Sequence, residues 1–89
     1  MRVDHDLVER IKKMYPEGTR LVLISMDDPR PIEPGTRGTV DFVDDIGTIH
    51  CKFDTGRCLG LIVGEDSFRK LTVDELREEL IKTQEIIED

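Results

Sequence analysis

The stretch that most constrains the fold is residues 34–40, where a proline and two glycines lead into a β-branched run. Pro34 presets the backbone for the second position of a tight turn, and Gly35 can adopt the positive φ that a type II turn requires at the third. Gly38 opens the next segment, and a glycine within a strand pattern marks a bulge or a close approach of the backbone. We therefore predict a chain reversal that leads into a strand near the middle of the chain.

The residues before this turn predict a helix, a strand and a loop. Apolar residues recur at three- and four-residue spacing over residues 4–15, which is typical of an amphipathic helix, and Pro16 ends it. Residues 21–24 form a short apolar, β-prone run that predicts the first strand. Residues 25–33 contain two prolines and adjacent aspartates, which favour an irregular loop.

The residues after the turn predict the remaining strands. In the strand expected at 38–43, alternation places Val40 and Phe42 together on the core side. A hairpin follows, and a three-residue loop with Gly56 in the left-handed region places Phe53 opposite Arg57. This register directs the large apolar groups of both hairpin strands to one face, whereas a two-residue loop would expose two leucines.

The predicted register separates the two cysteines. Cys51 points into the core and Cys58 points outward, which excludes a disulfide between them. A buried Cys51 is expected to be inert, and Arg57 provides the only cue for an activated thiol at Cys58. A catalytic Cys58 stays the enzymatic alternative, but no histidine and carboxylate are placed beside it, so we predict that the protein is not an enzyme.

The C-terminal residues predict a short closing element and a helix. Residues 68–71 form either a last strand or a 3₁₀ turn, and Thr72 and Glu75 have the spacing of a capping box. Apolar residues then keep a three-four spacing over residues 73–87, which predicts a helix. We expect this helix to dock on the barrel, because helices this short need tertiary packing. Self-association into a homodimer through the helix is the alternative.

With 89 residues, the chain has room for one domain with one core. Hydrophobic and charged residues each make up 37% of the chain, which is polar for a globular domain but not the profile of a disordered one. We therefore expect a single, mainly β domain over residues 1–89. It consists of a helix over 4–15, a small five-stranded barrel over 19–71 and a helix over 73–87.

The net charge of −7 is concentrated near the C-terminus, where residues 72–89 carry two basic and seven acidic residues. A field of this sign opposes non-specific binding to a phosphate backbone, so nucleic acid is a disfavoured partner. The sequence has no apolar run of membrane length and no signal-peptide pattern. Two cysteines without a disulfide framework fit a reducing compartment. We expect a cytoplasmic protein with no membrane partner.

Several blocks of this sequence resemble a known family. The blocks are Tyr15–Arg20, Ile24–Pro29, Pro34–Val40, Asp44–Gly47 and Phe68–Lys70. In this order they resemble the bacterial and phage-associated family of domains of unknown function four-three-one-four, over residues 14–71. The resemblance implies a small SH3-like barrel, carries no activity, and leaves both flanking helices outside. The chain departs from the family pattern at Phe53, often Trp, and at Thr55, often Asn.

In an SH3-like barrel, the loop after the first strand and the turn after the second commonly lie at one rim. Asp27, Asp28, Asp44 and Asp45 are then expected to form an acidic edge, with Arg37 beside it. Aspartates next to proline and glycine also form turns through side-chain bonds to the backbone, and we favour turn formation as their role. The five residues remain the binding candidates of this sequence.

We expect no metal and no cofactor. Adjacent His50 and Cys51 would point to opposite faces of a strand, and Asp44-Asp45 lacks the acidic spacing of a calcium loop. The first functional hypothesis is a non-enzymatic module that binds a protein partner through its acidic rim or its C-terminal helix. The alternative is a nucleic-acid-associated barrel or an acidic competitor of a basic nucleic-acid-binding protein.

Overall fold

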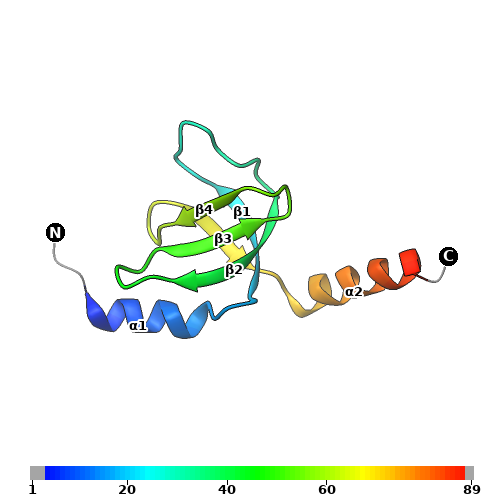
Figure 1. Ribbon diagram of the computed structural model, residues 1–89, viewed down its shortest axis with the longest axis horizontal. Helices are drawn as coiled ribbons and strands as arrows, with labels where there is room; N and C mark the ends of the chain where they lie inside the picture. Colours follow the sequence, from blue (N-terminus) through cyan, green and yellow to red (C-terminus); the bar gives the residue numbers. More distant parts are fainter. Residues whose placement is uncertain (1–3, 88–89) are drawn as a thin grey trace.

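The computed structural model describes residues 4–87, with side chains described as far as residue 82. It is a small, mainly β domain with a helix at each end of the chain (Figure 1). The elements are α1 (His5–Met14), β1 (Arg20–Ser25), β2 (Arg37–Val43), β3 (Ile49–Phe53), β4 (Cys58–Leu61), β5 (Ser67–Lys70) and α2 (Val73–Ile87). The predicted elements are all present, and the segment around residue 68 is a strand.

The five strands form one antiparallel sheet in the order β4-β3-β2-β1-β5. From β1 to β4, strands that are consecutive in the sequence are neighbours in the sheet, and β5 pairs with β1. Among the described strands no ladder joins β4 to β5, so the closure of the expected barrel is not confirmed. The prediction of a five-stranded, mainly β fold between two helices is confirmed.

The core lies on one face of this sheet, and its residues come from the alternating positions that the sequence predicted. Cys51 pairs with Leu59 and Ile49 pairs with Leu61, which is the predicted register. Gly56 has a φ of +98°, as the three-residue loop requires. The largest fully buried side chains are Phe53, Leu21, Leu23, Ile49, Leu61, Val40 and Cys51.

The two cysteines are free, as predicted from the register. Cys51 is buried and Cys58 is exposed. Burial raises the pKa of the Cys51 thiol to about 11, which keeps it protonated and unreactive at neutral pH.

The prediction that Phe42 faces the core is wrong. Val40 pairs with Cys51 but Phe42 pairs with His50, so Asp41 is an extra residue that forms a β-bulge. The bulge reverses the alternation, and Phe42 is 52% exposed on the outer face. There its ring stacks on His50, with ring centroids 4.3 Å apart.

The turn and strand entry at residues 34–40 form as predicted, and Gly38 is a site of close approach. The Thr36 amide donates to the Glu33 carbonyl at 3.1 Å, and Gly35 has a φ of +90°. A Cβ atom at Gly38 would lie 2.6 Å from the Cys51 sulfur. The strand therefore accepts only a glycine at this position without movement of its neighbours.

The helix α1 packs against one end of the sheet. Asp4 caps it by accepting a hydrogen bond from the Leu7 amide at 3.1 Å, and its buried residues are Val8 and Ile11. At its end the Tyr15 ring meets the edge of Phe68 of β5, with centroids 5.6 Å apart.

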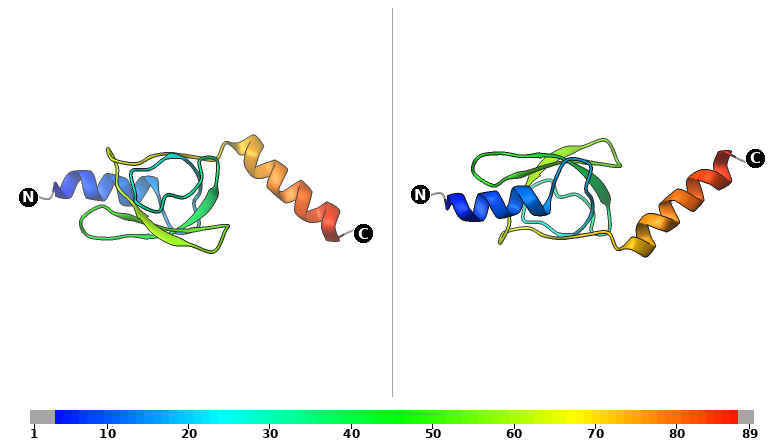
Figure 2. Two further views of the ribbon diagram at one scale, coloured as in Figure 1. Left: turned by 90° about the horizontal axis from the view of Figure 1, so that it is seen from above. Right: turned by 90° about the horizontal axis from the view of Figure 1, so that it is seen from below.

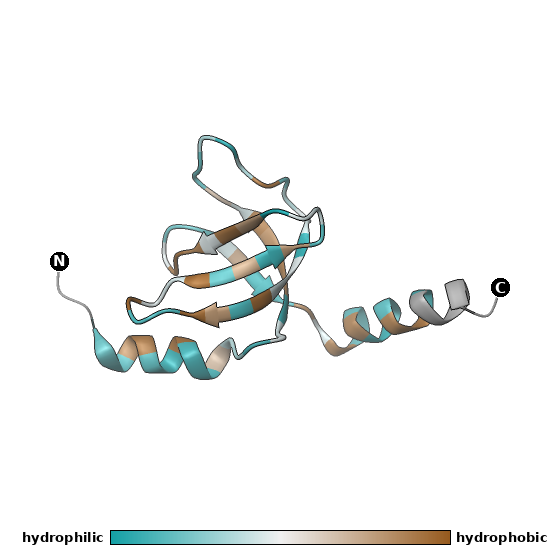
Figure 3. Cartoon of the chain, viewed as in Figure 1, coloured by the Kyte–Doolittle hydropathy of each residue, from teal (hydrophilic) through white to brown (hydrophobic). Residues whose placement is uncertain are grey.

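The helix α2 leaves the sheet at the end of the molecule opposite α1 and projects away from it (Figure 2). It accounts for much of the 54 Å long axis of a domain that is only 18 Å across its shortest one. Apolar residues recur along α2 (Figure 3), and its apolar side chains as far as residue 82 are exposed, Leu80 by 69%. We expected α2 to dock on the barrel, and its described apolar side chains do not make that contact; α2 reaches the sheet through glutamates instead.

Candidate functional site

Three arginines project from the same outer face of the sheet, and we call them the arginine face: Arg20, Arg37 and Arg69. Val22 of β1 pairs with Arg37 of β2 on one side and with Arg69 of β5 on the other. Directly paired residues point to the same side of a sheet, as do residues two apart on one strand. Arg20 precedes Val22 by two residues, so all three guanidinium groups share one face.

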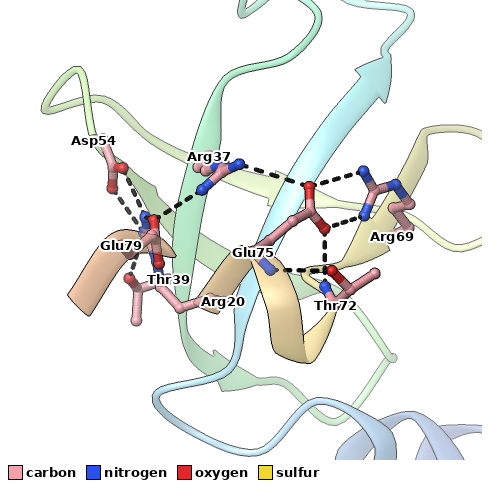
Figure 4. A network of polar contacts seen from close by, with 8 residues as sticks. All are labelled: Arg20, Arg37, Thr39, Asp54, Arg69, Thr72, Glu75 and Glu79. Carbon is pink, nitrogen blue, oxygen red and sulfur yellow. Dashed lines mark hydrogen bonds and ion pairs between the residues drawn. The ribbon is translucent and has the colours of Figure 1, made fainter. Parts of the chain in front are cut away.

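The first turn of α2 reaches this face through Glu75 (Figure 4). The Glu75 carboxylate accepts two hydrogen bonds from Arg69, at 2.7 and 3.1 Å, and lies 3.6 Å from the nearest Arg37 nitrogen. It also accepts from the Thr72 amide at 2.8 Å, while the Glu75 amide donates to the Thr72 hydroxyl at 3.1 Å. The predicted capping box is confirmed, and its carboxylate also holds the helix to the sheet.

The second turn of α2 reaches the face through Glu79. Its carboxylate accepts from Arg20 at 2.5 and 3.2 Å and lies 3.4 Å from Arg37. Arg20 also donates twice to Asp54 at 2.8 Å, and once to the Thr39 hydroxyl at 3.1 Å. Arg37 therefore lies between the two glutamates, and Arg20 and Arg69 each hold one of them.

The charges on this face stabilise one another. The carboxylates of Asp54 and Glu79 raise the pKa of Arg20, and the Arg20 guanidinium lowers the pKa of both carboxyl groups. Arg69 and the Thr72 amide lower the pKa of Glu75 to about 2. All these groups are ionised at neutral pH, and bidentate arginine–carboxylate pairs fix the angle at which α2 leaves the sheet.

Acid is expected to detach α2 from the sheet. A lowered carboxyl pKa means that the contact is at full strength above the ordinary glutamate value of 4.5 and is lost as the pH falls towards about 2. Arg69 and Arg37 face Glu75, and Arg20 and Arg37 face Glu79, while Asp54 also faces Arg20. Protonation of Glu75 removes the carboxylate that Arg69 binds, and protonation of both glutamates removes the ion pairs that hold α2 to the sheet. The carboxyl carbon shifts of both glutamates, followed by NMR, should move only well below pH 4.5. A titration of Glu75 at its ordinary value would contradict the arrangement.

The exposed apolar side chains of α2 lie next to the side of the helix that carries Glu75 and Glu79. Leu76 and Leu80 each follow an anchoring glutamate by one residue, which is about 100° around a helix. The apolar stripe, which we define as Val73, Leu76 and Leu80, is therefore turned away from the arginines and remains exposed. α2 is therefore attached to the sheet by its acidic side, and its apolar stripe is exposed to solvent.

The predicted acidic rim does not form, because its two halves lie at opposite ends of the strands. Asp27 and Asp28 follow the end of β1, and Asp44 and Asp45 follow the end of β2. Since β1 and β2 are antiparallel neighbours, their ends point in opposite directions (Figure 1).

Asp28, Asp44 and Asp45 each have a hydrogen-bond or ion-pair partner. Asp28 accepts from the Arg30 amide at 2.8 Å, and Asp45 pairs with Lys12 of α1 at 2.9 Å. Asp44 accepts from the amides of Ile46 and Thr48 at 3.1 and 2.9 Å. Turn formation, the favoured role, is confirmed for Asp28 and Asp44.

Of the predicted site residues, Arg37 alone lies on the arginine face. The residues that join it were missed: Arg20, Asp54, Arg69, Glu75 and Glu79. One signal in the sequence was available, because Glu75 and Glu79 are four residues apart and so share a helix face. Nothing in the sequence places that face against arginines from three different strands.

A second surface feature is an apolar groove of about 560 Å³ between α1 and the sheet. Exposed apolar residues that line it include Leu7, Met14, Ile24 and Val63. Arg10 and Asp66 supply its charged groups. Four of its lining residues belong to α1, which lies at the end of the molecule away from α2 (Figure 2).

A smaller hollow of about 160 Å³ is lined by His50 and Cys58, among others. The His50 ring nitrogen Nε2 lies 2.9 Å from the Asp44 carboxylate, and this contact lowers the pKa of Asp44. In the described part of the chain no hydrogen bond links His50 to Cys58. The sequence did not predict this histidine–aspartate pair, which joins the two ends of the β2–β3 turn.

Among the described residues, no group of three or more His, Cys, Asp or Glu side chains is arranged to hold a metal ion. Neither described helix combines the length and hydropathy of a membrane span.

Comparison with known proteins identifies a family model that matches residues 4–71, described as "Domain of unknown function (DUF4314)". The match covers α1 and all five strands and ends before α2. The family resemblance predicted for residues 14–71 is confirmed, and the matched region also includes α1, which that resemblance left outside. No curated protein shows significant similarity to the chain.

Proposed function

Because the chain belongs to the DUF4314 family, whose function is unknown, we propose from its structure that it is a non-enzymatic protein-interaction module. Its binding element is the apolar stripe of α2, and the partner is α2 of a second copy of the chain. The observation that carries this proposal is the stripe itself: three exposed apolar side chains on a helix that is anchored to its own domain through its acidic side.

The spacing of the stripe favours a second identical helix as the partner. Val73, Leu76 and Leu80 follow the three-four alternation of a two-helix seam, and Thr83 and Ile87 continue it in the sequence. Such a seam is self-complementary, so a two-fold dimer buries the same residues from both copies. Two heptads make a short seam, so we expect a weak, concentration-dependent dimer.

The anchoring of α2 also favours this use. Ion pairs from Glu75 and Glu79 hold the first two turns in place, so less conformational entropy is lost when the stripe binds. An isolated helix of this length would have to be ordered at the moment of binding.

Leu80→Asp is expected to abolish self-association. Burying a leucine contributes about 1.5–3 kcal/mol, and a two-fold dimer buries two copies of it, so the dissociation constant should rise by at least about 100-fold. Light scattering over a concentration series should show the mass of the native chain rising from 10.2 kDa towards twice that value, and that of the variant staying at 10.2 kDa.

The matched control is Ile81→Asp, which adds the same charge to a neighbouring exposed residue about 100° away from Leu80. This variant should associate like the native chain. A native chain that stays monomeric at every concentration would refute the proposal, as would equal losses in the two variants.

We also place the module in the cytoplasm, because two free cysteines fit a reducing compartment. The absence of a hydrogen bond between His50 and Cys58 in the described chain supports a non-enzymatic role. A phosphate backbone is a poorer partner than protein, since the arginine face is already neutralised by carboxylates and the chain carries a net charge of −7.

A further inference from the structure

The arginine face and the helix that covers it belong to different parts of the chain. Arg20, Arg37 and Arg69 lie within the region that the family model matches, and α2 lies outside it. The face is thus part of the family domain, whereas its occupant is an appended segment. This division raises the question of what the face binds when α2 is displaced.

The geometry of the face defines two carboxylate positions. One lies between Arg69 and Arg37 and holds Glu75, and the other lies between Arg37 and Arg20 and holds Glu79 (Figure 4). Residues four apart on a helix are about 6 Å apart along its axis. The planar fork of arginine matches a carboxylate better than a lysine would. The two positions therefore fit a helix that carries two carboxylates one turn apart.

The contact with α2 is of a kind that a competitor can replace. The polar pairs at Glu75 and Glu79 hold the helix, while the apolar stripe of α2 remains exposed. The side chains of the three arginines are between 20% and 48% exposed, so water reaches them. Ion pairs at such partly exposed sites set the position of α2 but add modest affinity, and the tether to the last strand keeps the local concentration of α2 high.

We propose that the arginine face is a docking site for an acidic helix of a partner protein, and that α2 is its built-in occupant. The partner helix carries two carboxylates at positions i and i+4 and displaces Glu75 and Glu79. A helix is favoured over a polyphosphate chain because the present occupant is a helix. Asp54 also lies on the face and repels additional negative charge. This proposal does not require self-association through the apolar stripe, and the test below separates the two.

The test uses the full chain carrying Glu75→Gln and Glu79→Gln, which vacates the face without shortening the protein. The probe is a fluorescent peptide of residues 72–89 that carries Leu80→Ala, which keeps both carboxylates on a helix-forming sequence but removes pairing with α2 through the apolar stripe. Fluorescence anisotropy at low salt should show that this peptide binds the variant at least about tenfold more tightly than the native chain. In the native chain the tethered helix competes at a high effective concentration.

Matched controls isolate the carboxylate positions. The chain carrying Asp74→Asn and Glu78→Gln loses the same two charges from exposed residues that do not touch the arginines, and it should bind the peptide as weakly as the native chain. A peptide carrying Glu75→Gln and Glu79→Gln should not bind. Adding Arg37→Ala to the vacated chain should remove binding, since Arg37 contacts both carboxylates.

Three results would overturn the proposal. The first is equal peptide binding by the vacated, native and control chains, provided that the amide spectrum of the strands shows that all are folded. The second is equal binding of the peptides with and without the two carboxylates. The third is a single-stranded oligonucleotide that binds the vacated chain when the peptide does not, because the face would then recognise phosphate.

Discussion

Phe53→Ala is expected to lower the free energy of unfolding by about 3–5 kcal/mol. The side chain is 1% exposed at the end of β3, and it is the largest of the fully buried residues. Its removal leaves a cavity that the surrounding strands fill only in part. Since small domains are stable by about 5–15 kcal/mol, the variant should unfold at a much lower urea concentration.

Phe42→Ala is the matched control, because it removes the same side chain from the same sheet. Phe42 lies on the outer face and contacts the ring of His50, so its loss should cost about 1 kcal/mol or less. Both values follow from urea unfolding monitored by circular dichroism. Similar losses at the two positions would mean that the bulge at Asp41 is absent and that Phe42 shares the core.

Gly38→Ala is expected to destabilise the protein by about 1–3 kcal/mol, although it adds only a methyl group. The new Cβ would lie 2.6 Å from the Cys51 sulfur, 3.0 Å from a Phe53 ring carbon and 3.1 Å from the Lys52 carbonyl oxygen. The last of these is a backbone atom of the paired strand, which cannot move without disturbing the ladder. At an open position the same change would stabilise the protein slightly by restricting the unfolded chain.

A double-mutant cycle separates this steric effect from backbone strain. Cys51→Ala removes the nearest atom, so part of the stability lost in Gly38→Ala should return when the two changes are combined. The measurement is again the free energy of unfolding in urea. Strict additivity of the two changes would show that the Cys51 sulfur is not the obstacle.

The two proposals assign different sides of α2 to different tasks. Glu75 and Glu79 hold the helix to the arginine face, and the apolar stripe about 100° away is left for a second chain. A partner that takes the arginine face would also release the stripe from its fixed direction. Changes at the glutamates are therefore expected to affect both the orientation of α2 and its use in association.

Much of the fold was predictable because its cause lies within a few neighbouring residues. The hairpin register follows from alternation and from Gly56, whose backbone adopts the left-handed region that the loop needs. The capping box follows from the spacing of Thr72 and Glu75. Closure of the barrel, by contrast, depends on how strongly the whole sheet curls, and no local pattern specifies it.

The failures each involve a long-range cause. Asp41 has no turn signal, so the bulge that exposes Phe42 could not be seen until β2 was paired with β3. The predicted acidic rim required the loops after β1 and β2 to lie at the same end of the strands, and the antiparallel pairing of β1 and β2 places them at opposite ends. Docking of α2 was predicted because a short helix needs tertiary packing, but acidic rather than apolar side chains make its contact with the sheet.

Local patterns in the chain specify its helices, its strands, its turns and the inward position of residues such as Phe53, because backbone sterics and hydrophobic alternation act over short distances. They do not specify the arginine face. Arg20, Arg37 and Arg69 come together only when β2 and β5 pair on either side of β1, and their carboxylate partners come from a helix that follows the last strand. Such a cluster depends on which strands become neighbours, and that choice is made by the packing of the whole sheet.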